Sequence, residues 1–189
     1  MASAAANYEL RRRARSFFAG VMSDDIREEL RNLGSEFVPS FHKLLGSEGW
    51  IGLQWPQELG GGGAGQLEGA IFQEEAALAG APMLASNVSS IGGDTLMAVA
   101  SKDLQERHLP GLISGESVFC LGYSEPDAGS DLSSLKTRAT QDDNLWLISG
   151  TKTFTSLAHV ADFMLCLART EHEADNDHAA LTVFVVPMT

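Results

Sequence analysis

The chain has 189 residues, and hydrophobic residues make up 44% of it, which is enough for one domain or two small ones and excludes disorder throughout. The net charge of −12 argues against nucleic acid or an anionic membrane surface as the main partner. Cys120 and Cys166 lie in apolar segments without CxxC or metal-ligand spacing, so we expect reduced core thiols, with a disulfide as the alternative.

The N-terminus carries no pattern of a secretory signal. Its arginines follow the small apolar residues, which is the reverse of the order in a signal peptide. No apolar run approaches the length of a membrane span. We expect a bacterial cytoplasmic protein whose first amphipathic helix covers residues 8–21; an organelle transit peptide is the alternative for this arginine-rich start.

The first half of the chain has a helical pattern. Apolar residues recur at helical spacing from the start, and Ser23 followed by two acidic residues predicts a helix N-cap. Pro56 and the neighbouring glycines predict a loop over residues 50–65. The predicted helices cover residues 8–21, 23–33 with a continuation or restart toward 45, 66–79, 83–100, and 101 to about 111.

After Gly115 the pattern changes to short β-type runs separated by turn residues. A hairpin turn is predicted at residues 142–144. We therefore predict an α+β chain, in which an N-terminal all-helical domain (1–115) precedes an incomplete antiparallel β-barrel or sandwich domain (116–189). The predicted strands cover residues 117–121, 135–140, 145–157, 163–170 and 181–186.

Residues 120–131 read Cys-Leu-Gly-Tyr-Ser-Glu-Pro-Asp-Ala-Gly-Ser-Asp and end a predicted strand in a turn of small and hydroxyl residues. Small residues let a ligand approach the backbone closely, and successive N–H groups in such a turn favour anions. Ser124 and Ser130 add hydroxyl donors and acceptors. Taken alone, this stretch is better interpreted as an ordinary polar turn.

Two further blocks accompany it. Residues 147–156 read Leu-Ile-Ser-Gly-Thr-Lys-Thr-Phe-Thr-Ser, and residues 49–61 read Gly-Trp-Ile-Gly-Leu-Gln-Trp-Pro-Gln-Glu-Leu-Gly-Gly. In this order the three blocks resemble the acyl-CoA dehydrogenase family of flavoproteins. The resemblance covers residues 8–189 and is most specific over 122–170.

The resemblance implies an oxidoreductase of lipid metabolism with FAD as cofactor and an acyl-CoA as substrate. In the family, a carboxylate removes the α-proton while flavin N5 takes the β-hydrogen as hydride, and an electron-transferring flavoprotein accepts the electrons. The glutamate base and much of the oligomer contact belong to a C-terminal helical-bundle domain, which is absent from these 189 residues. We therefore expect no catalytic residue in this chain, inactivity of the chain alone, and an oligomer as the complete enzyme.

The resemblance assigns ligand contacts to the first block residue by residue. Leu121, Tyr123 and Ser124 would lie against the flavin ring and its pyrimidine edge. Gly129 and Ser130 would lie near the FAD pyrophosphate, with Ser130 also close to the CoA arm as a substrate contact.

The resemblance also assigns residues of the block 147–156 to the flavin. Phe154, Thr155 and Ser156 would meet the other side of the ring, with Ser156 near N5. Many relatives carry tryptophan in place of Phe154 and glycine in place of Asp127, so both positions depart from the family pattern. Taken singly, Phe154 is a sheet-core residue, Ser156 a strand-end hydroxyl and Tyr123 a cross-strand aromatic; three blocks in register favour the flavin.

Other chemistry-bearing residues are expected to be structural. Glu74 and Glu75 are interpreted as helix-surface or helix-packing acids, and Glu125 as a residue that holds the turn. Lys152 is expected to form an ion pair on the sheet surface. Histidines and acids over residues 171–178 are interpreted as a solvated hairpin loop rather than a metal site, because their spacing matches no ligand pattern.

The loop with Trp50, Trp55 and Pro56 is expected beside the acyl pocket, as in the family, or else as an aromatic-anchored helix connection. Apolar helices around Ile71 and residues 83–97 would line the acyl end. The Gly-Tyr-Ser-Glu-Pro form is similar to that of relatives acting on bulky acyl-CoAs such as steroid side chains.

Two alternatives to an acyl-CoA dehydrogenase segment stay open. The chain could be a non-catalytic flavin- and acyl-CoA-binding subunit that pairs with a complementary subunit of a hetero-oligomeric dehydrogenase. It could also be part of a related flavin oxidase or monooxygenase.

Overall fold

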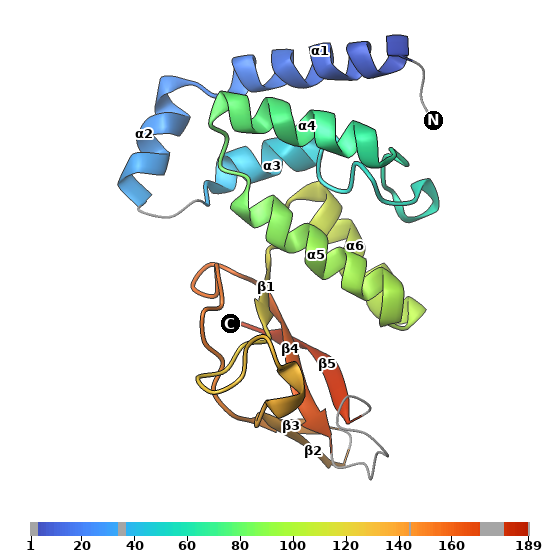
Figure 1. Cartoon of the computed structure of the whole chain (residues 1–189), viewed down its shortest axis with the longest axis vertical. Helices are drawn as coiled ribbons and strands as arrows, with labels where there is room; N and C mark the ends of the chain where they lie inside the picture. The colour runs from blue at the N-terminus through green and yellow to red at the C-terminus, as the bar shows by residue number, and fades with distance from the viewer. Residues whose placement is uncertain (1–3, 34–36, 144, 171–179, 189) are drawn as a thin grey trace. The chain divides into compact units, whose positions relative to one another are not determined.

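A computed structural model describes residues 4–33, 37–143, 145–170 and 180–188 (Figure 1). The chain divides into two compact units, Met1–Val118 and Phe119–Thr189. The first contains the α-helices and the second the strands. A helical part followed by a β part is the order that the sequence predicts.

The helical unit contains six α-helices and one 3-10 helix among the described residues. Two of the α-helices, those that start at Asp24 and Lys102, have a serine N-cap. Ser23 Oγ accepts from the Ile26 amide at 3.3 Å, and Ser101 Oγ accepts from the Leu104 amide at 3.4 Å. The predicted N-cap at Ser23 is thereby confirmed. The elements are α1 (Ala4–Val21), α2 (Asp24–Leu33), α3 (Pro39–Ser47), η1 (Gln57–Leu59), α4 (Gln66–Ala79), α5 (Leu84–Val99) and α6 (Lys102–Ser114).

Aromatic side chains form much of the core of the helical unit. The Trp50 ring stacks on Phe72 with centroids 4.8 Å apart, and Phe18 lies 5.4 Å from the same Phe72 ring. All three are nearly inaccessible to solvent. Trp50 follows α3, Phe72 lies on α4 and Phe18 on α1, so one cluster joins three helical segments.

The described strands form one five-stranded sheet centred on β4. Along one edge β4 pairs with β5, and along the other it pairs first with β1 and then with β2, which is also paired to β3 (Figure 1). Trp146 of β3 meets Phe184 of β5 with centroids 5.3 Å apart, so the sheet curls. The strands are β1 (Phe119–Gly122), β2 (Arg138–Asp142), β3 (Leu145–Ser149), β4 (Phe163–Thr170) and β5 (Leu181–Pro187).

The sheet is mixed, whereas the sequence predicts an antiparallel one. The β2–β3 and β4–β5 pairs are antiparallel, but β1 and β2 both run parallel to β4. Residue patterns report which positions are buried and where hairpin turns lie. They carry no information on the direction in which distant strands pair, and this accounts for the error.

The predicted strand over residues 145–157 is also too long. It ends at Ser149, and Gly150 then passes so close to Thr137 that a Cβ at this position would collide with it. Phe154 and Leu157 follow with φ of 53 and 67, so the chain is not extended there. The predicted reduced thiols are confirmed, since Cys120 and Cys166 are free and buried in β1 and β4.

Candidate functional site

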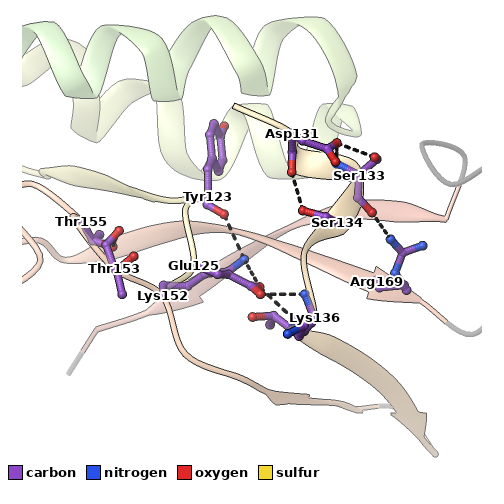
Figure 2. Close-up of polar contacts among 11 residues, drawn as sticks. Tyr123, Glu125, Asp131, Ser133, Ser134, Lys136, Lys152, Thr153, Thr155 and Arg169 are labelled. Atoms are coloured by element: carbon purple, nitrogen blue, oxygen red, sulfur yellow. Dashed lines mark hydrogen bonds and ion pairs between the residues drawn. The ribbon is translucent and has the colours of Figure 1, made fainter. Parts of the chain in front are cut away.

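The β unit brings together the two segments that the sequence singles out. The Thr153 amide donates to the Ser124 carbonyl oxygen at 2.9 Å, which joins the turn after β1 to the segment after β3. Figure 2 shows Thr153 and Thr155 in the same segment as Lys152, whose side chain reaches Tyr123 and Glu125. The residues expected on two sides of one ligand therefore belong to adjacent pieces of backbone.

The buried side chain of Lys152 bonds to the same turn and so helps to hold the two segments together. Its Nζ donates to the Tyr123 carbonyl at 3.2 Å and to Glu125 Oε1 at 2.9 Å (Figure 2). The Lys152 side chain is 8% exposed and that of Glu125 is 6% exposed. The expected ion pair exists, but its expected position on the sheet surface is wrong, because the segment after β3 packs against the residues after β1 and covers the Lys152 side chain.

Glu125 connects a third segment to the other two. Its Oε2 accepts from the Lys136 amide at 2.6 Å and its Oε1 from the Thr137 amide at 2.8 Å. Burial acts to raise the pKa of the Glu125 carboxyl, but hydrogen bonds from Thr137, Lys136 and Lys152 outweigh it and lower the pKa to about 2. The carboxylate stays charged and holds the turn, as the sequence analysis expects.

The turn itself is closed by local hydrogen bonds. The Glu125 amide donates to the Ala128 carbonyl at 2.7 Å, and the Ala128 amide donates back at 3.2 Å. Asp127 forms an exposed ion pair with Lys136 at 2.8 Å. Its charge is therefore partly offset by a neighbouring cation. Asp131 accepts from the Ser133 amide at 3.1 Å and caps η2 (Leu132–Ser134).

The expected ligand residues of the first block lie along the end of β1 and its turn. Leu121, Tyr123 and Ser124 are half-buried, while Gly129 and Ser130 are exposed. A Cβ built on Gly129 would meet no atom within 4 Å. The backbone of this turn is therefore open to a bound molecule.

The expected ligand residues of the second segment include an unusual aromatic. The Phe154 side chain is 94% exposed and its backbone is left-handed, a conformation that costs a bulky residue free energy and recurs at ligand sites. Thr155 is half-buried and Ser156 exposed. An open turn, available hydroxyls and an exposed aromatic face fit a flavin dinucleotide. The alternative interpretation of Phe154 as a sheet-core residue is wrong, because its side chain is exposed.

The buried acids among the described residues are unsuited to act as a base. Glu75 is 2% exposed and its carboxylate is held by Arg15 and Arg11. Hydrogen bonds from Arg15 and then Arg11 lower the pKa of Glu75 to about 2, against the opposing effect of burial. Glu125 is restrained in the same way. A general base needs a pKa nearer the working pH.

The helical unit holds a cavity of about 310 Å³ between α4, α5 and the loop after α3. Residues that the sequence analysis expects near the acyl end are in its lining: Trp50, Trp55, Pro56, Met83 and Met97.

The same cavity has a polar side that sequence reasoning missed. Asn87, Ser90 and Asp94 line it from α5, and Gln73 of α4 donates to Asn87 Oδ1 at 3.0 Å. The spacing of these residues with Met83 puts them on one helix face, which is the pattern that could have revealed them.

Other kinds of site are not found in the described part of the chain. Within it, no helix is long and apolar enough to cross a membrane. No group of three or more histidine, cysteine or acidic residues could hold a metal ion there. The histidine-containing stretch 171–178 lies outside the described residues.

Comparison with known families gives two matches in chain order. Residues 5–116 match the family description "Acyl-CoA dehydrogenase, N-terminal domain" and residues 120–189 match "Acyl-CoA dehydrogenase, middle domain". Together the two descriptions cover nearly the whole chain.

Named relatives come from mycobacteria. Acyl-CoA dehydrogenase FadE26 of Mycobacterium tuberculosis is 37% identical over 188 residues, with 96% of this chain and 47% of the relative covered. For FadE29 of the same organism, identity is 34% over 181 residues, with 94% and 46% covered. The chain thus spans about half the length of these relatives.

Solved structures agree in fold. A chain of the ChsE4–ChsE5 complex from Mycobacterium tuberculosis is 35% identical with a TM-score of 0.87, covering 100% of this chain and 48% of that one. A chain of the Tcur3481–Tcur3483 steroid ACAD is 37% identical with a TM-score of 0.83, covering 98% and 48%.

Proposed function

Because the chain belongs to the acyl-CoA dehydrogenase family, we propose that it supplies the helical and flavin-binding parts of an FAD-dependent enzyme that introduces an α,β double bond into an acyl-CoA thioester. The observation that carries this proposal is the junction between Ser124 and Thr153, beside the exposed ring of Phe154. It joins the two segments to which the family resemblance assigns the flavin.

The residues at the end of β1 and in its turn are proposed to bind FAD. Leu121, Tyr123 and Ser124 hold one side of the flavin, and Gly129 and Ser130 hold its pyrophosphate, with Ser130 also near the CoA arm. When bound, FAD would accept the substrate's β-hydrogen as hydride. The chain's own task is to bind and orient the cofactor and to shield the ring from water.

The second segment completes the proposed cofactor site. Phe154, Thr155 and Ser156 cover the opposite side of the ring. The Phe154 ring has its face free for stacking, since 94% of the residue is exposed. Such a contact would gain apolar burial without displacing any core packing.

The acyl group is proposed to enter the helical unit. The cavity that Trp55, Met83 and Met97 line lies where the family resemblance expects the acyl end. The names of the relatives support an acyl-CoA as the ligand class.

The chain alone is proposed to bind ligands without turnover. The two buried glutamates among the described residues, Glu75 and Glu125, are held by cations or backbone amides, with pKa values of about 2. The base is proposed to come from the part of the enzyme that the relatives have and this chain does not span.

A second candidate is a subunit of a hetero-oligomeric dehydrogenase, and the likeness to a chain of the ChsE4–ChsE5 complex favours it. In this proposal, a complementary subunit brings the base and completes the oligomer. An electron-transferring flavoprotein is proposed as the acceptor on the family resemblance. The bacterial origin of the named relatives supports the expected cytoplasmic location.

The test is to purify the 189-residue chain by gel filtration and measure visible flavin absorbance in the protein peak, before and after incubation with FAD. We expect bound FAD, and no reduction of an electron acceptor when acyl-CoA is added. A folded chain that takes up no FAD contradicts the flavin site, and turnover by the chain alone contradicts the missing base.

A further inference from the structure

We propose that Lys152 is a positioning residue of the ligand site: its buried ammonium holds the turn after β1 and the segment after β3 in the relative placement that a ligand needs. This inference rests on the proposed flavin-binding function. It assigns a task to a residue that the family resemblance does not place against the flavin.

The geometry gives Lys152 contacts with both pieces of the first block. Its Nζ reaches the Tyr123 carbonyl at 3.2 Å and Glu125 Oε1 at 2.9 Å. Both charged side chains are more than nine-tenths buried. In this low-dielectric setting the two bonds are held firmly, because an unpaired buried charge costs much more than an exposed one.

Glu125 extends the connection to a third strand. The Lys136 and Thr137 amides, just before β2, donate to its two oxygens. One ion pair therefore ties together residues 123–125, 136–137 and 152–153. The Lys136–Asp127 ion pair of the same unit is, by contrast, exposed to solvent.

The ligand-facing residues depend on this network for their placement. Phe154 is 94% exposed, so its own packing cannot fix it. It is two residues from Lys152, and between them Thr153 donates to Ser124. On the other side, the carbonyl that Lys152 holds belongs to Tyr123 and precedes Ser124. The buried pair, whose bonds to Tyr123 and Lys136 Figure 2 shows, thus acts at or within two residues of the expected contacts in both segments.

The test compares FAD affinity with folding in matched variants of the 189-residue chain. Lys152→Met removes the ammonium and leaves Glu125 unpaired. The double variant Glu125→Gln/Lys152→Met removes both charges, so no buried charge lacks its partner. Glu125→Gln is measured beside it, because a glutamine side chain cannot accept from both the Lys136 and the Thr137 amides. Lys43→Met is the control, since it removes an exposed lysine that pairs with Glu116 at 3.0 Å in the helical unit.

We expect the double variant to unfold cooperatively like the unsubstituted chain but to bind FAD at least about tenfold more weakly, because the loss of about one well-placed contact weakens binding by this factor. Lys43→Met should bind FAD normally. A double variant that binds FAD as tightly as the unsubstituted chain overturns the proposal. A double variant that does not fold also overturns it, since Lys152 would then maintain the whole unit rather than position the site.

A measurement without ligand separates this inference from the proposed function. Hydrogen exchange of the Thr153 amide should be about tenfold faster in the double variant, while the Leu165 amide in β4 exchanges at an unchanged rate. If the unsubstituted chain binds no FAD, the flavin proposal fails while this readout still decides on positioning. Unchanged exchange at Thr153 overturns the positioning role.

Discussion

Glu75 of α4 and Arg15 of α1 form a two-bond ion pair, with Arg15 Nε and Nη2 donating to the two carboxylate oxygens at 2.8 Å each. Arg11 adds a third bond to Oε1 at 2.7 Å. The Glu75 side chain is 2% exposed. One buried carboxylate therefore anchors the first helix of the chain to a helix some sixty residues later.

Replacing that carboxylate should loosen the helical unit. We expect Glu75→Gln to lower the free energy of unfolding by roughly 1–3 kcal/mol, because a neutral amide cannot accept the same charged bonds at a buried position. Glu74→Gln is the control, since Glu74 pairs with Arg11 but is 57% exposed, and such pairs contribute little. Urea unfolding followed by circular dichroism measures both, and equal losses would contradict the assignment.

The same carboxylate should make stability depend on acid. The pKa of Glu75 is lowered from 4.5 to about 2, so its contribution is complete above the unfolded pKa and is lost as the pH falls through the folded one. We expect the melting temperature to fall as the pH is lowered from 5 to 2. Glu125 should contribute to the same fall, because its pKa is also lowered to about 2. The fall should be smaller in Glu75→Gln, and identical pH profiles would exclude this role.

The close packing of α3 on α6 should be sensitive to a single methyl group. A Cβ at Gly46 would collide with the Ser114 carbonyl and come within 2.6 Å of the Gly115 amide. We expect Gly46→Ala to cost about 1–3 kcal/mol through overpacking. Gly20→Ala in α1 meets no atom within 4 Å and should instead stabilise by roughly 0.5–1 kcal/mol. Thermal unfolding of the two variants should shift in opposite directions.

Phe154 should separate stability from ligand binding. It is 94% exposed and has φ of 53, so Phe154→Gly removes no packing and suits the backbone better. Glycine removes the strain of the left-handed backbone, which stabilises the folded state, but it also gives the unfolded chain more freedom, which opposes this gain. The free energy of unfolding should therefore stay unchanged or rise by up to about 1 kcal/mol. FAD affinity should nevertheless fall, as titration would measure. A variant that loses stability or retains full affinity would argue against the ligand role.

The local features were the ones that the sequence could predict. Ser23 and Ser101 cap helices because a hydroxyl at that position meets a free amide two or three residues on. The hairpin at residues 142–144 follows from turn-forming residues between two β-type runs, although residue 144 itself is outside the described part. These depend on neighbours in the chain alone.

The site was predictable only in part, because its geometry depends on distant contacts. The pattern located the two segments, and the structure joins them through Ser124 and Thr153. The burial of Lys152 could not be inferred, since its partners Tyr123 and Glu125 lie 29 and 27 residues away in the chain. Contacts between such remote segments have no local residue pattern.

The position of β4 at the centre of the sheet has a consequence for biosynthesis. Phe119 of β1 pairs with Phe163 of β4, so β1 leaves the ribosome well before its partner exists, whereas the helical unit contains its own packing partners within Met1–Val118. Pairings of such long range are slow and expose apolar strands during synthesis. A nascent chain should therefore pass through a stage in which folded helices precede an unpaired apolar strand, and chaperone capture would be most effective then.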